Sequence, residues 1–277
     1  PTSDESLDKL PISGEVNGEW QTFPDAAALD EALNTEPAPE PAGNFHITDD
    51  DLGIGGPKQK YARNIEAIRT LFQLEQEHRG ATAEEQQVLS QYVGWGGLAD
   101  AFNPGKDSWA KEYAELKGLL SEDEYAAARS STLNAHYTSP VVIRSIYDAV
   151  EKMGFQSGNI LEPSMGAGNF FGMLPTSMAD SRLYGVELDS ITGRIAKKLY
   201  PQADITVAGF ETTDRRDFYD LAVGNVPFGQ YKVNDKAYNK LGFSIHNYFF
   251  AKAIDQVRPG GIVAFVTSRY TMDSKDS

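Results

Sequence analysis

From about residue 133 onward, short apolar runs alternate with longer segments that have helical periodicity. The runs that predict strands cover residues 159–162, 182–187, 204–207, 221–224 and 261–267. Two of the segments between them, 190–200 and 245–257, place apolar residues at helical spacing. Strands that alternate with helices predict a mostly parallel, doubly wound sheet with right-handed crossovers. The expected fold class is therefore α/β.

The fourth predicted strand runs directly into the sequence Asn225-Val226-Pro227-Phe228. Pro227 has no amide hydrogen and a fixed φ, and it pushes Val226 toward an extended conformation. A rigid corner is therefore expected at the carboxyl end of a strand, where open α/β sheets bind ligands. The corner offers a side-chain amide, backbone carbonyls and an aromatic ring.

These groups suit chemistry on the exocyclic amine of a nucleobase. The lone pair of that amine is delocalised into the ring, and two acceptors on its hydrogens would localise it. The side-chain oxygen of Asn225 and the carbonyl of Val226 can be these acceptors, and Phe228 can stack on a base swung out of a helix. The alternative interpretation is a tight turn with a phenylalanine in the core.

A glycine-rich turn, Glu-Pro-Ser-Met-Gly-Ala-Gly, follows the first predicted strand at residues 162–168. Glycine lets a ligand approach the backbone, and the next helix offers its N-terminal amides. Only Gly166-x-Gly168 remains of the dinucleotide-binding pattern. Glu187 gives the stronger indication, because it lies 19 residues beyond Gly168 at the tip of the next strand. An acid in that place binds ribose hydroxyls; the alternative is a solvated strand end.

Residues 133–268 resemble the adenine-N6 DNA methyltransferases of the gamma type. The motifs that carry the resemblance occur in that family's order: Thr138-Ser139-Pro140, residues 161–170, residues 185–189 and residues 225–228. The resemblance implies a Rossmann-like methyltransferase sheet, S-adenosylmethionine as the cofactor and a flipped adenine in DNA as the methyl acceptor. No metal site is expected, because the four histidines are too scattered to form a cluster.

The resemblance also implies roles for single residues. Thr138 and Pro140 would border the methionine end of the cofactor, Glu187 would hold the ribose, and Phe210 would lie beside the adenine. The residues expected to bind the cofactor are Thr138, Pro140, Glu162, Pro163, Ser164, Gly166, Gly168, Phe170, Glu187, Leu188, Phe210 and Asn225. The residues expected to hold the target base are Asn225, Val226, Pro227 and Phe228.

Three departures from the family pattern leave alternatives open. Val226 stands where the family usually has proline, although valine keeps the backbone carbonyl. Gly209 stands where the family commonly has an acid for the cofactor amino group, and the last two strands of the fold would lie beyond residue 277. An inactive methylase-like module that binds nucleic acid or a partner is therefore the alternative function. Methylation of RNA or of a protein glutamine is a third.

The composition and motifs of the first 132 residues predict two further regions of the chain. Residues 1–57 are acidic and proline-rich and are expected to form a poorly ordered arm with a short helix near 25–33. Residues 58–132 are expected to be helical, with capping boxes at Thr82 and Ser121. The Gly94-Trp95-Gly96-Gly97 motif is interpreted as a packing corner between helices. Residues 133–277 are expected to form the truncated methyltransferase-like domain.

Residues 60–140 resemble a second group, the very large phage and plasmid proteins in which a methylase-like domain precedes a helicase domain. The motifs are Ala62-Arg63-Asn64-Ile65 and residues 92–98. Such proteins are often linked to protection from restriction. The resemblance implies a helicase domain in the same polypeptide, and the polar ends of the chain favour a fragment of a longer protein.

The composition limits the expected partners and compartment. The net charge of −15 argues against a free-standing nucleic-acid binder, so other parts of a larger protein are expected to supply most phosphate contacts. The chain has no cysteine and four scattered histidines, which excludes disulfides and thiolate metal sites. No apolar run reaches membrane-spanning length, so we expect a cytoplasmic protein without a membrane partner.

Overall fold

The computed structural model describes residues 11–16, 19–34, 41–132, 138–227, 229 and 231–268. The chain divides into two compact units, residues 1–40 and residues 41–277. This division differs from the boundaries at 57 and 132 that the sequence predicted. The reason is that residues 41–57, the helical region and the sheet share one hydrophobic core in the second unit.

The first unit contains a β-hairpin and a helix, in a segment that the sequence predicted to be poorly ordered. β1 (Ile12–Val16) and β2 (Glu19–Phe23) pair in antiparallel register, with Ile12 opposite Phe23. α1 (Ala26–Asn34) follows, and Asp25 accepts a hydrogen bond from the amide of Ala28 at 2.8 Å, as an N-cap does. Leu29 of α1 packs on Gly14 of β1. The described parts of residues 12–34 therefore form two strands and a helix, and the predicted short helix is present.

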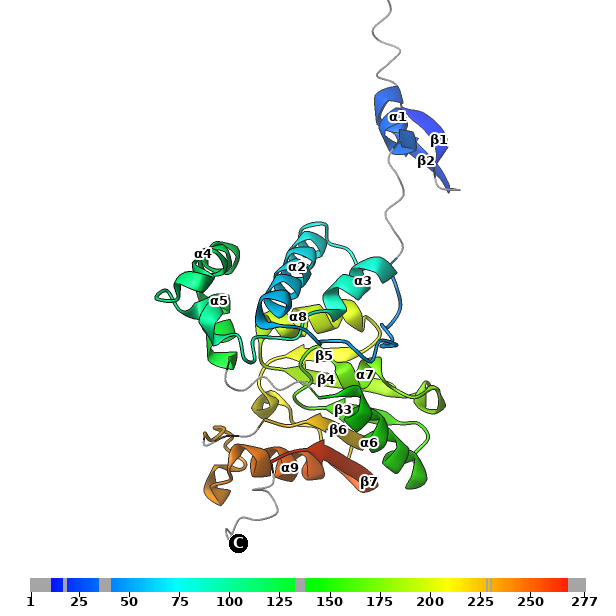
Figure 1. Ribbon diagram of the computed structural model, residues 1–277. Coiled ribbons are helices and arrows are strands. Elements are labelled where there is room, and N and C mark those ends of the chain that lie inside the picture. The colour runs from blue at the N-terminus through cyan, green and yellow to red at the C-terminus, as the bar shows by residue number, and fades with distance from the viewer. Residues whose placement is uncertain are drawn as a thin grey trace, which may run out of the picture. The chain divides into compact units, whose positions relative to one another are not determined.

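The second unit is built on a parallel sheet, as predicted (Figure 1). Its strands among the described residues are β3 (Asn159–Glu162), β4 (Arg182–Glu187), β5 (Asp204–Val207), β6 (Tyr219–Asn225) and β7 (Val257–Val266). Their order in the sheet is β5-β4-β3-β6-β7, and each neighbouring pair is parallel. The chain runs outward from β3 through β4 to β5 and then crosses back to β6. The switch point of the sheet therefore lies between β3 and β6.

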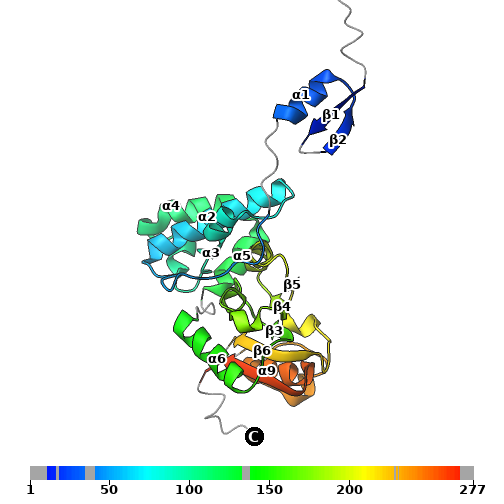
Figure 2. The same cartoon turned by 90° about the vertical axis from the view of Figure 1, so that its right-hand side faces the viewer.

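Helices cover both faces of this sheet, so the sheet is doubly wound (Figure 2). They are α6 (Pro140–Lys152), α7 (Asn169–Gly172), α8 (Ser190–Leu199) and α9 (Ile245–Gln256). Ile160 and Leu221 face the core that α6 and α8 share, whereas Leu161 and Ala222 face the core under α9. Successive strand residues point to opposite faces, so both faces of these strands are apolar.

The helical region packs on α8 rather than standing apart. It comprises α2 (Pro57–Gln76), α3 (Ala83–Ser90), α4 (Ala110–Leu119), α5 (Glu122–Ser131) and the 3-10 turns Ala99–Phe102 and Asp107–Trp109. Both predicted capping boxes are present, at Thr82 with Glu85 and at Ser121 with Glu124. Arg194 of α8 binds Glu75 of α2 and Glu124 of α5, so one guanidinium joins three helices.

The segment before α2 runs along the same body. The amide of Phe45 donates to the carbonyl of Leu199 at 2.8 Å, and the amide of Ile47 donates to the carbonyl of Gly172 at 2.7 Å. Ile47 is buried in the core of the second unit. These backbone bonds tie residues 41–47 to α7 and α8.

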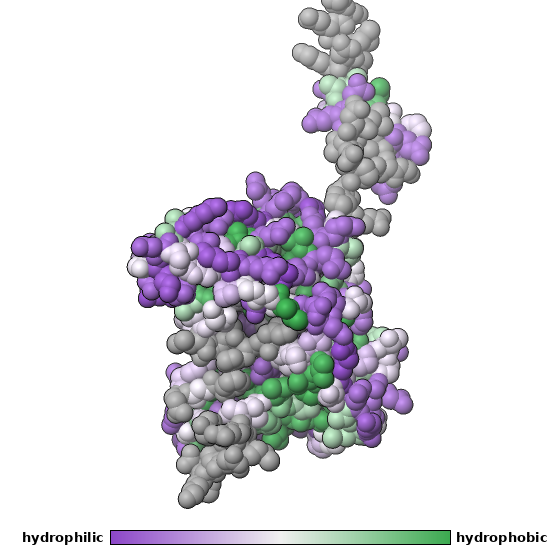
Figure 3. Space-filling view, viewed as in Figure 1, coloured by the Kyte–Doolittle hydropathy of each residue, from purple (hydrophilic) through white to green (hydrophobic). Residues whose placement is uncertain are grey.

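β7 is one of the two edge strands of the sheet among the described residues, since it pairs with β6 alone. It begins at Val257, four residues before the predicted start, and its register against β6 shifts between Tyr219 and Leu221. Apolar residues gather on part of the surface of the second unit (Figure 3). Val141 and Val142 of α6 are exposed.

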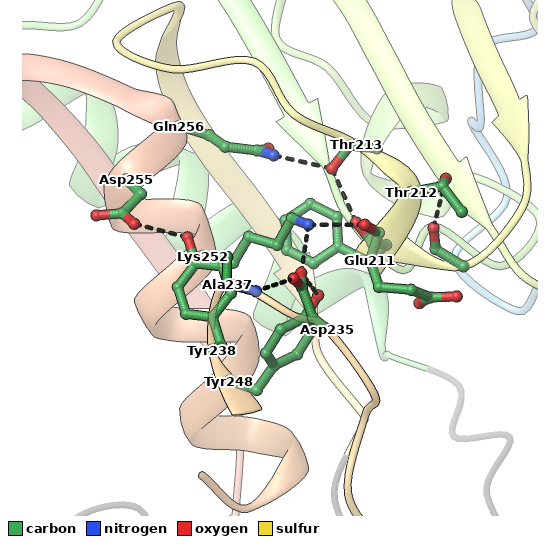
Figure 4. A network of polar contacts seen from close by, with 12 residues as sticks. Glu211, Thr212, Thr213, Asp235, Ala237, Tyr238, Tyr248, Lys252, Asp255 and Gln256 are labelled. Atoms are coloured by element: carbon green, nitrogen blue, oxygen red, sulfur yellow. Dashed lines mark hydrogen bonds and ion pairs between the residues drawn. The ribbon is translucent and has the colours of Figure 1, made fainter. Parts of the chain in front are cut away.

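A buried polar network holds residues 235–238 against α9 and the 3-10 turn Phe210–Thr212 (Figure 4). Nζ of Lys252 lies 2.8 Å from Oδ2 of Asp235 and donates to the carbonyl of Glu211 at 3.1 Å. The hydroxyl of Tyr248 donates to the same Asp235 oxygen at 2.8 Å, and the hydroxyl of Tyr238 donates to Asp255 at 2.6 Å. The network thus fixes the chain that follows the Asn225 corner.

Candidate functional site

A cavity of about 220 Å³ opens at the carboxyl ends of β3, β4 and β6, at the switch point of the sheet. Its lining combines the glycine-rich turn, the tip of β4, the corner after β6 and part of the helical region. The lining residues are Tyr92, Val93, Gly94, Ser131, Thr138, Glu162, Ser164, Met165, Gly166, Ala167, Asn169, Phe170, Glu187, Asp189, Thr192, Asn225, Val226 and Pro227.

The glycine-rich turn owes its shape to two left-handed residues. Gly166 has φ 56° and Gly168 has φ 84°, a region that residues with a Cβ seldom occupy. Gly168 donates to the carbonyl of Met165 at 2.8 Å and is the N-cap of α7. A Cβ on Gly168 would also collide with the ring of Tyr200. Both glycines are therefore required by this turn, and Gly166 reaches the cavity.

Glu187 ends β4 and faces the glycine-rich turn. Its Oε2 accepts a hydrogen bond from the amide of Gly166, and its Oε1 accepts one from the amide of Asp189, both at 2.8 Å. Burial raises the pKa of the Glu187 carboxyl to about 7, although these two backbone hydrogen bonds lower it in part. The carboxyl is thus held in one orientation and titrates near neutrality.

Glu162 ends β3 and is almost fully buried beside Glu187. Its side chain is 2% exposed, and its Oε2 has no hydrogen-bond partner within the described part of the chain. Burial, followed by the charge of Glu187, raises the pKa of the Glu162 carboxyl well above its usual range. A buried polar atom without a partner costs about 1–3 kcal/mol. The cavity therefore presents an oxygen that a bound ligand would satisfy.

The corner after β6 lies next to Glu162. Gly224 has φ 149°, and a Cβ there would lie 3.2 Å from Cγ of Glu162. Because glycine has no side chain, β6 can pack closely against Glu162, and Asn225 at its end lines the cavity. The amide of Val226 donates to the carbonyl of Val266 at 3.1 Å, which fixes the corner to β7. Asn225, Val226 and Pro227 all line the cavity.

The structure brings many of the predicted site residues together around the cavity. Those that line it are Thr138, Glu162, Ser164, Gly166, Phe170, Glu187, Asn225, Val226 and Pro227. Phe228 lies outside the described residues.

Other predicted residues lie apart from the lining. Pro140 is buried at the first position of α6, and Pro163 and Gly168 shape the turn without lining the cavity. Leu188 is 76% exposed. Phe210 stacks on Phe249 of α9 with ring centroids 5.0 Å apart, and it is buried in that core.

Gly209, the position where the family pattern expects an acid, is filled from a neighbouring residue. A Cβ on Gly209 would collide with the carboxylate of Glu211. An acidic side chain therefore does lie against this backbone position, although it comes from two residues further along the chain. Neither Gly209 nor Glu211 lines the cavity.

The sequence reasoning missed the residues that the helical region gives to the cavity. Tyr92, Val93 and Gly94 lie between α3 and the turn Ala99–Phe102, about a hundred residues from Thr192, which lines the same cavity. The sequence feature that could have indicated these lining residues is the adjacent glycine-tryptophan motif. It was interpreted as a packing corner, and Trp95 is indeed buried, with 1% exposure.

Viral proteins are among the relatives of the chain in sequence. It is 27% identical over 191 residues to "Defense against restriction protein B" of Escherichia phage P1, an alignment that covers 67% of this chain and 7% of that protein. It is 34% identical over 93 residues to "Type II methyltransferase M.CvrRI" of Paramecium bursaria Chlorella virus XZ-6E, covering 33% of this chain and 24% of that protein. The chain therefore spans less than a quarter of the length of either relative. No family model matches the chain.

One solved structure that matches the chain is a protein from Listeria monocytogenes described as a class I S-adenosylmethionine-dependent methyltransferase. The TM-score is 0.43 at 14% identity, over 79% of this chain and 76% of that one. A protein from Methanococcus maripaludis, described as an S-adenosylmethionine-dependent methyltransferase, gives a TM-score of 0.33 at 14% identity, over 57% and 62% of the two chains.

The sheet order and the cavity define the class of the protein: a doubly wound α/β protein with a cavity at the switch point of its sheet. Its relatives in sequence include a viral methyltransferase. Within the described residues, no helix is long and apolar enough to cross a membrane, and no cluster of potential metal ligands occurs.

Proposed function

We propose that this chain carries the cofactor site and the catalytic corner of an S-adenosylmethionine-dependent methyltransferase that modifies N6 of adenine in DNA. One observation carries the proposal. The same cavity joins the carboxyls of Glu162 and Glu187 to the corner of Asn225, Val226 and Pro227. A cofactor and a nucleobase amine bound there would meet inside one site.

The residues of the cavity fit this cofactor. S-adenosylmethionine, when bound, supplies an electrophilic methyl group on a positively charged sulfonium. Three carboxyl groups line the cavity, on Glu162, Glu187 and Asp189. They complement the sulfonium, the ammonium and the ribose hydroxyls of the cofactor. Glu162 Oε2 is the buried atom that would gain a hydrogen-bond donor.

The corner would act on the target amine without a charged base. Asn225 Oδ1 and the carbonyl of Val226 would accept the two amine hydrogens and so localise the lone pair on nitrogen. Holding the amine in line with the methyl group supplies much of the rate by proximity. The proton then leaves to solvent. Val226 keeps the carbonyl that this role needs, so its departure from proline is compatible with the chemistry.

DNA as the substrate, and a helicase domain in the same polypeptide, complete the proposal. The phage relative is named as a defence against restriction, and adenine methylation would protect DNA in that way. Because the net charge is −15, we place most phosphate contacts outside this chain. RNA and protein glutamine stay as less favoured acceptors.

The proposal is tested by calorimetric titration of the full chain with S-adenosylmethionine and by transfer of labelled methyl to duplex DNA. We expect binding that Glu187→Ala abolishes, and label that is recovered as N6-methyladenine. Glu151→Ala, on the exposed surface of α6, is the matched control and should bind normally. Cofactor binding without transfer to any DNA would favour the alternative function, a methylase-like binding module. A chain that binds no cofactor would overturn the proposal.

Cofactor affinity should rise with pH through neutrality. The free Glu187 carboxyl has a pKa raised to about 7, so it is half protonated there. A cationic cofactor and ribose hydroxyls favour the carboxylate, and binding below pH 7 must therefore release a proton. We expect about a tenfold gain in affinity from pH 6 to pH 8. Calorimetry in two buffers of different ionisation enthalpy would detect the proton, and Glu187→Gln should remove the dependence.

A further inference from the structure

One wall of the cavity comes from the helical region, outside the part of the chain that resembles methyltransferases. This wall is the 92–94 segment: Tyr92, Val93 and Gly94. It faces the tip of β4 and the glycine-rich turn, since Asp189, Thr192 and Gly166 line the same cavity. The proposed function assigns it no role.

A buried side-chain amide holds this wall in place. Asn64 of α2 is fully buried, and its Nδ2 donates to the carbonyl of Gly94 at 2.6 Å. Its Oδ1 accepts from the amide of Val93 at 3.0 Å. Gly94 has φ 72°, so the backbone here also needs glycine. Asn64 thus satisfies both sides of the turn that carries the wall.

Aromatic packing anchors the same segment from behind. Trp95 lies with its ring centroid 5.3 Å from that of Phe102 in an edge-to-face contact, and 6.2 Å from that of Tyr61. All three side chains are buried. The wall is therefore part of a rigid core rather than a loop that drifts over the cavity.

A chain of hydrogen bonds links this wall to Glu187. The hydroxyl of Thr192 donates to Oδ1 of Asp189 at 2.6 Å, and it also makes a longer contact of 3.4 Å to the hydroxyl oxygen of Tyr92. The amide of Asp189 in turn donates to Oε1 of Glu187. Burial, followed by the charge of Asp189, raises the pKa of Tyr92, which keeps its hydroxyl protonated.

We propose that the 92–94 segment is a second half of the cofactor site and forms a fixed wall against the nucleoside of the cofactor. Tyr92 and Val93 would contact the ribose side, and Asn64 would be a positioning residue that acts through the backbone of Val93 and Gly94. This inference rests on the proposed function. It adds that the helical region is needed for cofactor affinity and not only for folding.

The test uses the full chain and S-adenosylhomocysteine, the product form of the cofactor, in calorimetric titration. Val93→Phe adds bulk on the cavity wall and should lower affinity at least tenfold with little change in Tm. Tyr92→Phe removes one hydroxyl and should lower affinity about three- to tenfold. Tyr113→Phe makes the same change on α4, away from the cavity, and should leave affinity unchanged.

Asn64→Asp separates positioning from folding. It keeps an acceptor for Val93 but loses the donor to Gly94, so affinity should fall when measured well below the Tm of the variant. Hydrogen exchange gives a second readout, because bound S-adenosylhomocysteine should protect the amides of the 92–94 segment in the unaltered chain.

The outcomes separate this inference from the proposed function. Binding by the unaltered chain, with Val93→Phe and Tyr92→Phe equal to it and no protection of the segment, would overturn the inference alone. No binding by the unaltered chain would overturn both.

Discussion

Replacing Asn225 with alanine is expected to lower methyl transfer to DNA by about 10²–10³-fold while cofactor affinity stays within about threefold. Removing one preorganised hydrogen-bonding group at a reacting atom has an effect of that size. Asn225 ends β6 and lines the cavity, and its position depends on the glycine conformation of Gly224. Single-turnover transfer of labelled methyl, measured beside calorimetric titration of the cofactor, separates the two effects.

The matched control for Asn225→Ala is Asn103→Ala, at an exposed turn of the helical region. It should transfer methyl at the rate of the unaltered chain. If Asn225→Ala keeps its rate, the amine is not held by this side chain and the proposed mechanism is wrong. Equal losses of affinity and rate would instead place Asn225 in cofactor binding.

Replacing Lys252 with methionine is expected to lower the free energy of unfolding by about 3–5 kcal/mol. Lys252 and Asp235 form an ion pair whose side chains are 5% and 10% exposed, beside the rings of Tyr238 and Tyr248 (Figure 4). Removing the ammonium leaves the Asp235 carboxylate buried without its counter-charge, and the hydroxyl of Tyr248 and the amide of Ala237 compensate only in part. Urea denaturation of the full chain measures the loss.

Two further variants decide whether the pairing itself is responsible. Lys240→Met, at an exposed position on the turn Asn239–Leu241, should change stability by less than about 0.5 kcal/mol. The double variant with Asp235→Leu should be less destabilised than the sum of the single variants, because no lone charge is left buried. Full additivity would contradict the ion pair.

The sheet could be predicted because its signals are local. Residues 159–162, 182–187 and 204–207 are strands within the bounds that their apolar runs gave, and the capping boxes at Thr82 and Ser121 each fixed a helix start. The corner at Asn225 followed from the effect of Pro227 on its neighbours.

The hairpin of the first unit was missed although its signal is also local. Asn17-Gly18 lies between the two segments that form β1 and β2, and this dipeptide is typical of a two-residue hairpin turn. The acidic and proline-rich composition was given more weight than this pair of residues, which led to the expectation of an arm.

Contacts between distant parts of the chain could not be predicted. Phe210 stacks on Phe249, 39 residues later, a contact that no local pattern indicates. The wall made by Tyr92 reaches Thr192 only because α3 packs on α8. A motif can identify a residue type, whereas the partner of that residue depends on tertiary packing.

The single guanidinium of Arg194 has a consequence for how such a protein can change over evolutionary time. It binds Glu75 and Glu124 from two helices of the helical region while it belongs to a helix of the sheet. Recombination could join this sheet to the helices of a diverged relative that lacks these residues. Either the arginine or the two acids would then lie at a half-buried junction without their partners. The helical region and the sheet are therefore inherited most safely as one block, and exchangeable modules are better sought outside residues 41–268.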